Sequence, residues 1–208
     1  MNFYNKLMVI DNFIDEDYQE KIKTKLLGSK DLKEQQFPWY HVQDVTEGYE
    51  NDSKKRPGLA HQYVSLPYED DDDLDYDSLG KVVSEHHNLF IPLLKKVGYK
   101  LGLPDVRVLQ GRSFLQFPIN TDGTVDVPHV DIHGDIDFIV ALYYVVDSDG
   151  DTLIYNERYK GLEGQYTIKE SVTPKQGRIV IFDGRLYHTA KQPINSNTRC
   201  IVNYNLAI

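Results

Sequence analysis

The sequence has few of the features that mark secreted, membrane-spanning or nucleic-acid-binding proteins. It contains one cysteine, Cys200, which excludes an intrachain disulfide and favours a reducing compartment. No apolar run approaches the roughly 20 residues of a membrane-spanning helix, and the first residues lack the charged-then-apolar order of a signal peptide. The 23 basic and 32 acidic residues give a net charge of −9, which argues against a phosphate-binding surface. We therefore expect a soluble, cytoplasmic protein that binds neither membrane nor nucleic acid.

The 208 residues suit one domain, and its N-terminal part, residues 1–105, has a helical and irregular texture. An apolar run at 7–10 precedes a helix expected from about Asp15 to Leu27, which ends at Gly28. The stretch 29–56 is polar and is expected to form loops with a short strand or two. Apolar residues at helical spacing predict a second helix over 78–101. The acidic run from Glu69 to Asp77 is expected to be a solvated loop of no predicted role, because like charges resist burial.

From residue 106 to the end the pattern changes to short runs rich in Val, Ile, Phe and Tyr, separated by Gly, Asp, Asn and Pro. These runs predict strands at 106–117, 138–146, 152–155, 165–170, 178–182 and 199–206. Strands at this spacing are typical of a sandwich or jelly roll. The predicted fold is therefore α+β and mainly β: a jelly-roll core over 106–208, buttressed by N-terminal helices.

One short segment has the residue types and spacing of a metal site. His129 and Asp131 are two residues apart, and in an extended segment they point to the same side. His188, just after a β-like run, is the best candidate for a third ligand. Two histidines and one carboxylate leave positions open on an octahedral metal such as Fe(II). We interpret His133 as a loop residue near the mouth of the site.

The last predicted strand carries a second candidate group. Arg199 follows His188 by eleven positions, and its planar guanidinium matches the far carboxylate of a dicarboxylate that chelates the metal. Strand alternation places one polar set and one apolar set on opposite faces: Arg199, Ile201, Asn203 and Asn205 against Cys200, Val202, Tyr204 and Leu206. The alternative is that the polar face meets solvent and Arg199 forms a surface ion pair of little value. His86, His87 and Cys200 are interpreted as structural residues.

Four stretches together resemble the 2-oxoglutarate and Fe(II)-dependent dioxygenase superfamily, and within it the prolyl 4-hydroxylase-like branch. They are PHVD at 128–131, LYYV at 142–145, PKQGRIVIF at 174–182, and YHT at 187–189 leading to Arg199. The resemblance covers about residues 112–206. It implies a double-stranded β-helix, which is the jelly roll of this superfamily.

The resemblance also implies roles for individual residues. His129, Asp131 and His188 would be the iron ligands, Arg199 would bind the distal carboxylate of 2-oxoglutarate, and Tyr144 would support that carboxylate. Phe117 departs from the branch, which often has a tyrosine lining the co-substrate pocket there. The pocket walls are expected from 119–127 and 132–137, with Trp39, Tyr40 or Arg112 as further candidates.

The implied reaction consumes O2 and 2-oxoglutarate, releases succinate and CO2, and hydroxylates a C–H bond, with ascorbate as an optional reductant. The first interpretation is a hydroxylase of a prolyl or other amino-acid residue in a peptide or protein. The second keeps the iron site and changes the substrate to a small metabolite or nucleobase. The third is a jelly-roll binding domain without catalysis. The sequence predicts no oligomeric state.

Overall fold

The computed structural model describes residues 3–29, 37–45, 55–66, 79–103, 105–119, 125–160 and 164–208. The acidic run at 69–77 and the middle of the predicted wall loop 119–127 lie outside the described residues. Within the described ranges, no helix is long and apolar enough to span a membrane.

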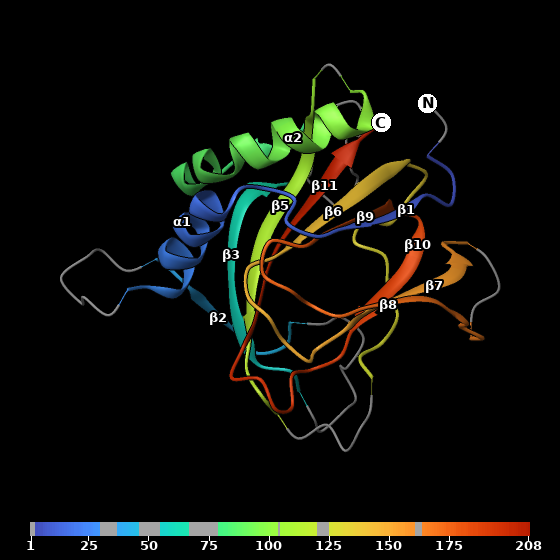
Figure 1. The fold of residues 1–208 in the computed structure, drawn as a ribbon. Helices are drawn as coiled ribbons and strands as arrows, with labels where there is room; N and C mark the ends of the chain where they lie inside the picture. The colour runs from blue at the N-terminus through green and yellow to red at the C-terminus, as the bar shows by residue number, and fades with distance from the viewer. Residues whose placement is uncertain are drawn as a thin grey trace.

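Two antiparallel sheets form the centre of the molecule (Figure 1). The larger sheet has the strand order β1 (Leu7–Ile10), β9 (Ile179–Asp183), β6 (Phe138–Tyr144), β11 (Arg199–Ala207), β5 (Arg107–Gln116), β3 (Gly58–Ser65) and β2 (Tyr40–Val42), with β4 (Lys81–Val82) paired to β3. The smaller sheet has the order β10 (Leu186–Ala190), β7 (Thr152–Arg158) and β8 (Ile168–Val172). Two facing sheets of this kind are the predicted jelly roll, so the fold class is confirmed.

The helices lie along one face of the larger sheet (Figure 1). Helix α1 (Glu16–Leu27) begins after Asp15, whose carboxylate accepts a hydrogen bond from the Tyr18 amide at 3.0 Å. Helix α2 (Ile91–Leu101) ends at Gly102, which adopts a left-handed conformation with φ 68°. The buried faces of both helices and one face of the larger sheet share one hydrophobic cluster. The N-terminal part therefore buttresses the jelly roll, as expected.

The helix predicted over 78–101 is wrong in its first half. Residues 81–82 form β4, a 3-10 helix, η1 (Glu85–Phe90), follows, and only 91–101 are α-helical. Pro92 explains the boundary, because proline lacks an amide N–H and is tolerated only in the first turn of a helix. His86 and His87 therefore lie in the 3-10 helix.

Strands β3 and β10 were not predicted, and β10 is important because it carries His188. Only Gly184 and Arg185 separate β9 from β10, yet the two strands belong to different sheets. A Cβ at Gly184 would lie 2.2 Å from the Phe138 ring, so glycine is required where the chain crosses from one sheet to the other. A local sequence pattern does not reveal such a crossing.

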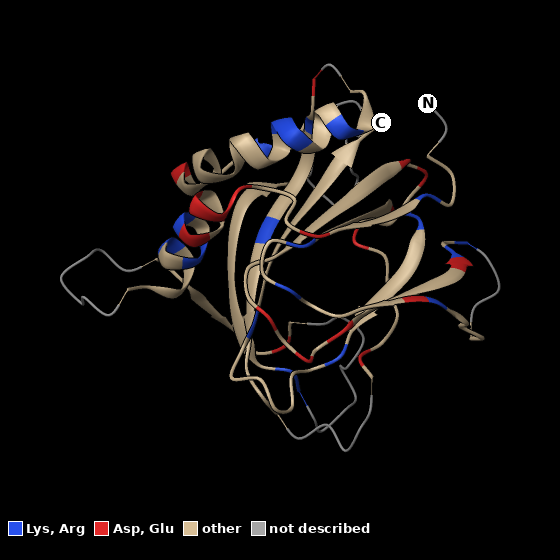
Figure 2. Ribbon diagram, viewed as in Figure 1, with Lys and Arg blue, Asp and Glu red and all other residues tan. Residues whose placement is uncertain are grey.

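Strand β11 confirms the predicted alternation. Its apolar residues Cys200, Val202, Tyr204 and Leu206 belong to the cluster beneath the helices. Its other face looks into the space between the sheets, where a second hydrophobic cluster forms around Ile154, Phe182 and Ile201. Charged side chains elsewhere lie mainly on helices and loops (Figure 2). The charged residues that line the space between the sheets, Arg112, Asp131 and Arg199, are therefore unusual.

Candidate metal centre

A short backbone bridge places the two predicted histidine ligands opposite each other. The His129 amide donates to the His188 carbonyl, and the His188 amide donates to the His129 carbonyl, both at 2.9 Å. This reciprocal pair is the hydrogen-bonded pair of an antiparallel ladder. The two imidazole ring centroids consequently lie 4.7 Å apart.

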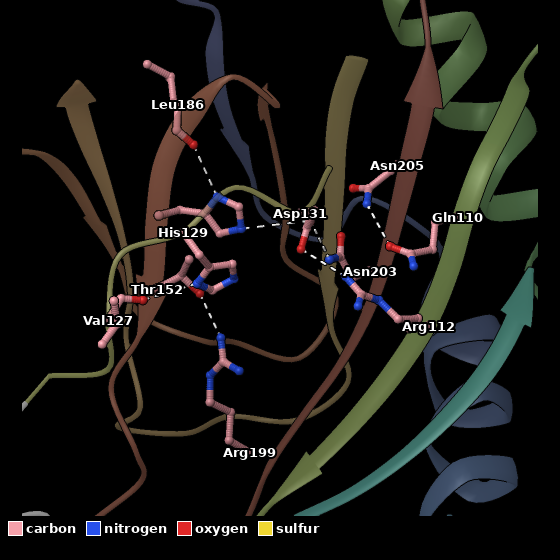
Figure 3. Close-up of polar contacts among 11 residues, drawn as sticks. Gln110, Arg112, Val127, His129, Asp131, Thr152, Leu186, Arg199, Asn203 and Asn205 are labelled. Carbon is pink, nitrogen blue, oxygen red and sulfur yellow. Dashed lines mark hydrogen bonds and ion pairs between the residues drawn. The ribbon is translucent and has the colours of Figure 1, made fainter. Parts of the chain in front are cut away.

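Asp131 completes the group. One ligand atom from each of His129, Asp131 and His188 lies within 4.8 Å of the other two, which is the spacing expected around one metal ion. His188 is buried, and the other two residues are half-buried. Figure 3 shows His129 and Asp131 pointing into the same space. The structure therefore brings together the three residues that the sequence proposed as ligands.

Hydrogen bonds prepare both imidazoles for metal binding. The Nδ1 atom of His129 lies 3.2 Å from the Val127 carbonyl, and that of His188 lies 3.2 Å from the Leu186 carbonyl. A carbonyl only accepts, so Nδ1 carries the proton and the lone pair is on Nε2. Burial lowers the pKa of His188 to about 4 and keeps the ring neutral at pH 7. Both rings therefore offer Nε2 to a metal.

The carboxylate of Asp131 is held at both oxygens (Figure 3). Arg112 Nη2 donates to Oδ1 and Asn203 Nδ2 donates to Oδ2, each at 2.9 Å. Burial alone raises the pKa of Asp131, but His188 and Arg112 outweigh it and lower the pKa to about 2. Two imidazoles and one carboxylate fit a ferrous ion with open positions, so the donor set suits the implied metal.

Arg199 lies in the same pocket and is buried. Its Nε donates to the Gly150 carbonyl at 2.8 Å, Nη1 to Gln116 Oε1 at 2.6 Å and Nη2 to Thr152 Oγ1 at 2.8 Å. All three partners are uncharged, and within the described part of the chain no carboxylate forms an ion pair with Arg199. Burial lowers the pKa of Arg199, because a buried charge is costly, while Tyr144, Asp126 and Asp151 act in the opposite direction. The guanidinium forms no direct hydrogen bond to an anion among the described residues, and a ligand can provide one.

Other predicted pocket residues have mixed outcomes. Arg112 lines the pocket, as predicted. Trp39, Tyr40 and Phe117 are not among its lining residues. Tyr40 and Phe117 are exposed, and the Trp39 indole N–H donates to the Leu26 carbonyl. Gln116, the neighbour of Phe117, lines the pocket instead. The stretch 132–137 contributes no lining residue.

Tyr144 reaches Arg199 indirectly. Its hydroxyl donates to Thr152 Oγ1 at 2.8 Å, and the same Thr152 oxygen accepts from Arg199. Burial raises the pKa of Tyr144 to about 12, so the hydroxyl keeps its proton. Tyr144 itself is not among the pocket-lining residues, and its contact with a co-substrate stays a prediction.

The remaining histidines and the cysteine lie away from the three ligands. His133 is exposed and contacts the Tyr159 ring at 5.4 Å between centroids. His87 Nδ1 lies 3.0 Å from the Tyr204 hydroxyl. Cys200 is buried in the core beneath the helices, and burial raises its thiol pKa.

Sequence reasoning missed a chain of buried polar side chains that ends on Arg199. The Asp126 carboxylate accepts from Arg56 Nε at 2.8 Å and from Gln192 Nε2 at 2.6 Å. Gln116 Nε2 donates to Gln192 Oε1 at 3.4 Å, and Gln116 Oε1 accepts from Arg199. The one available signal was the position of Asp126, three residues before His129; the other members carry no local signal.

Comparisons with known proteins support the jelly-roll fold. Neither a family model nor a curated protein matches the sequence. Solved structures do match: a 2OG-Fe(II) oxygenase family oxidoreductase from Burkholderia pseudomallei has a TM-score of 0.66 at 10% identity, covering 97% of this chain and 84% of that one. A Pseudomonas putida prolyl-4-hydroxylase has a TM-score of 0.56 at 12% identity, covering 98% and 92%.

A third matching structure was solved with a metal and 2-oxoglutarate bound. HygX from Streptomyces hygroscopicus, solved with nickel and 2-oxoglutarate bound, has a TM-score of 0.53 at 13% identity, covering 98% of this chain and 83% of that one. At these identities the likeness establishes the fold. The chain has the fold of the 2OG-Fe(II) oxygenases, including prolyl 4-hydroxylases, and it carries a His-Asp-His cluster in its central pocket.

Proposed function

We propose that the protein is an Fe(II)- and 2-oxoglutarate-dependent dioxygenase. It hydroxylates a C–H bond of a prolyl or other amino-acid residue in a peptide or protein and releases succinate and CO2. The observation that carries this proposal is the sharing of one pocket by a His-Asp-His cluster and a buried arginine whose partners are all uncharged. A metal-chelating dicarboxylate satisfies both groups at once.

The residues of the pocket have separate tasks. His129, Asp131 and His188 would hold the iron, and Arg199 would hold the distal carboxylate of 2-oxoglutarate. When bound, iron and 2-oxoglutarate together supply the oxidising chemistry with O2. Gln116, Thr152 and Gly150 keep the guanidinium in place, and Tyr144 orients the Thr152 hydroxyl from behind.

The pocket walls supply shielding and a limit on size. Apolar side chains line it beside the polar ones, namely Val45, Phe114, Val130, Leu142 and Ile201, and they exclude water from the reacting atoms. The cavity volume of about 90 Å³ is small beside the roughly 300–1,000 Å³ of typical small-molecule sites. This small volume favours a substrate that enters with only part of a larger molecule, such as a segment of a peptide.

The first experiment measures metal and co-substrate binding. Fe(II) is titrated without O2, and 2-oxoglutarate is then added while the charge-transfer absorption of the chelate is recorded. We expect both to bind wild type, and we expect His188→Ala to lose most of its iron affinity, because one of three protein ligands is removed. His133→Ala, a histidine outside the cluster, is the matched control and should bind as wild type does.

The second experiment measures succinate released in the presence of O2, first alone and then with peptides and small metabolites. Stimulation by proline-containing peptides supports the proposed substrate, and stimulation only by metabolites or nucleobases assigns the same chemistry to a different substrate. If His188→Ala binds iron and releases succinate as wild type does, the proposed function is wrong and a binding domain is the better description.

A further inference from the structure

Two buried polar atoms beside the ligand Asp131 have no hydrogen-bond partner among the described residues. They are the Nε donor of Arg112 and the Oδ1 acceptor of Asn203. Both residues line the pocket, and Asn203 is only 6% exposed. Leaving a buried polar atom unpaired is costly, so two of them in residues that line one pocket point to a ligand that completes them.

The orientation of the Asn203 amide follows from its partner. Asn203 Nδ2 donates to Asp131 Oδ2 at 2.9 Å, so the NH2 group of the amide faces the carboxylate. The amide oxygen is then the atom left without a partner. Arg112 uses Nη2 toward the same carboxylate, which leaves Nε as an unused donor. One acceptor atom and one donor atom of two pocket-lining residues are therefore unused.

The register of the sheet places these two atoms on neighbouring strands. Asn203 of β11 is the direct cross-strand partner of Arg112 of β5, and such pairs have their Cβ atoms about 5 Å apart. A ligand that satisfies both must present a donor and an acceptor toward the same side. In an extended peptide, the N–H and C=O of one residue point to the same side, as they do in an antiparallel ladder.

We propose that Arg112 and Asn203 form a subsite that binds the main chain of a peptide substrate. Arg112 Nε donates to the carbonyl of one extended residue, and Asn203 Oδ1 accepts from its N–H. This inference rests on the proposed function and narrows its substrate to an extended peptide. Because proline has no N–H, the bound residue is a neighbour of a hydroxylated proline and not the proline itself.

The test is a double-mutant cycle in which one change is the substitution of Asn203 and the other is methylation of one amide nitrogen of the peptide. Capped pentapeptides with a central proline are assayed for succinate release above the level without peptide, and the best one is methylated at each amide nitrogen in turn. At one position, we expect methylation to raise KM roughly two- to tenfold, the value of one hydrogen bond. In Asn203→Ala the same methylation should have no further effect, because the acceptor is already gone.

Asn205→Ala is the matched control. Asn205 lies two residues further along β11 and does not line the pocket, so this variant should keep the full methylation effect. The cycle compares the effect of methylation on KM within each enzyme. The loss of the hydrogen bond from Asn203 to Asp131 affects both peptides equally in Asn203→Ala, so it cancels. A methylation effect of equal size in wild type and Asn203→Ala overturns the subsite while the proposed function stands.

Two further results also overturn the subsite. One is a peptide that is turned over without sensitivity to methylation at any position. The other is an enzyme that binds Fe(II) and 2-oxoglutarate but is stimulated by no peptide, which rejects the peptide substrate and leaves the iron chemistry in place. Loss of iron binding itself would instead reject the proposed function.

Discussion

Arg199 is a buried cation held by a carbonyl, an amide oxygen and a hydroxyl, and its proposed role can be separated from that of the three proposed metal ligands. We expect Arg199→Ala to weaken 2-oxoglutarate binding about ten- to a hundredfold, because charge-assisted hydrogen bonds to the distal carboxylate are lost. Iron affinity should change little. Arg199→Lys should be intermediate, since it keeps the charge and loses the planar fork.

The measurement is anaerobic titration of the iron-loaded protein with 2-oxoglutarate, together with a separate iron titration. Arg178→Ala, which removes an arginine whose ion pair with Asp11 is at the surface, is the control. An equal loss of iron and 2-oxoglutarate in Arg199→Ala would show that Arg199 supports the fold instead of the co-substrate.

Asp126 acts on Arg199 through two amides, and its charge sets their direction. A carboxylate only accepts, so it fixes Gln192 Nε2 toward itself, and Gln192 Oε1 in turn fixes Gln116 with its own oxygen toward Arg199. In Asp126→Asn the new amide can donate to Gln192, and the side-chain amides of both glutamines can then flip. Gln116 would then direct its NH2 group at the guanidinium of Arg199, and two hydrogen-bond donors would face each other.

We therefore expect Asp126→Asn to lower 2-oxoglutarate affinity severalfold while iron affinity stays within about twofold. Stability should also fall, by roughly 3 kcal/mol, because the negative charge facing buried Arg56 is removed. Binding titrations at a temperature where the variant is fully folded separate the two effects. Unchanged 2-oxoglutarate affinity in a folded variant would contradict the relay.

At the scale of elements, the segment that leads into β11 depends on Asp149. Its carboxylate accepts hydrogen bonds from the backbone amides of Ile194, Asn195 and Ser196, at 2.7 to 3.2 Å. The next residue, Gly150, provides the carbonyl that binds Arg199. Asp149 thus ties the loop before β11 to the segment that orients Arg199.

Burial raises the pKa of Asp149, but the amides of Asn195, Ile194 and Ser196 outweigh it and hold the pKa well below its usual range. A lowered folded-state pKa means that the stabilisation is present above the unfolded pKa of about 3.9 and is lost as pH falls toward the folded value. We expect Asp149→Asn to cost about 1–3 kcal/mol at pH 7.

Urea unfolding at pH 7 and near pH 3 measures this effect. The difference between wild type and Asp149→Asn should shrink at the lower pH, because the Asp149 carboxylate of the unfolded chain binds a proton there while that of the folded protein stays ionised. Asp147→Asn, at a site that accepts one backbone hydrogen bond from Gln176, is the control and should show a smaller loss. If the difference in free energy of unfolding between wild type and Asp149→Asn is the same at both pH values, the ionised Asp149 carboxylate does not stabilise the loop.

At the scale of the whole molecule, two hydrophobic clusters on opposite faces of the larger sheet have different relations to the site. Ile154 is fully buried between the sheets and is the strand partner of His188, whereas Leu101 of α2 is fully buried in the cluster between the helices and the larger sheet. Truncating either to alanine should cost about 2–5 kcal/mol.

Only Ile154→Ala should also weaken iron binding, because the cavity left by the truncated side chain lies next to β10, the strand that carries His188. Thermal unfolding gives the loss of stability, and iron titration well below each midpoint gives the affinity. Equal iron affinities in Ile154→Ala and Leu101→Ala would show that packing between the sheets does not position the ligand.

The alternation of residues along a strand allowed much of the site to be predicted from sequence. Period two placed His129 and Asp131 on one side, and it separated Arg199 and Asn203 from the apolar residues of β11. The fold class followed from the spacing of the strands. The helix boundary at Pro92 had a local signal too, which the apolar periodicity of 78–101 concealed.

The sequence by itself determined the faces of the strands, the helix ends and the residue types able to hold a metal, because these depend on neighbours a few positions apart. Only the tertiary structure decided that His188 pairs with His129, that Arg112 and Asn203 converge on Asp131, and that Asp126 reaches Arg199 through two glutamines. The physical reason is that these contacts join segments far apart in the chain, and their geometry is set by sheet register and packing.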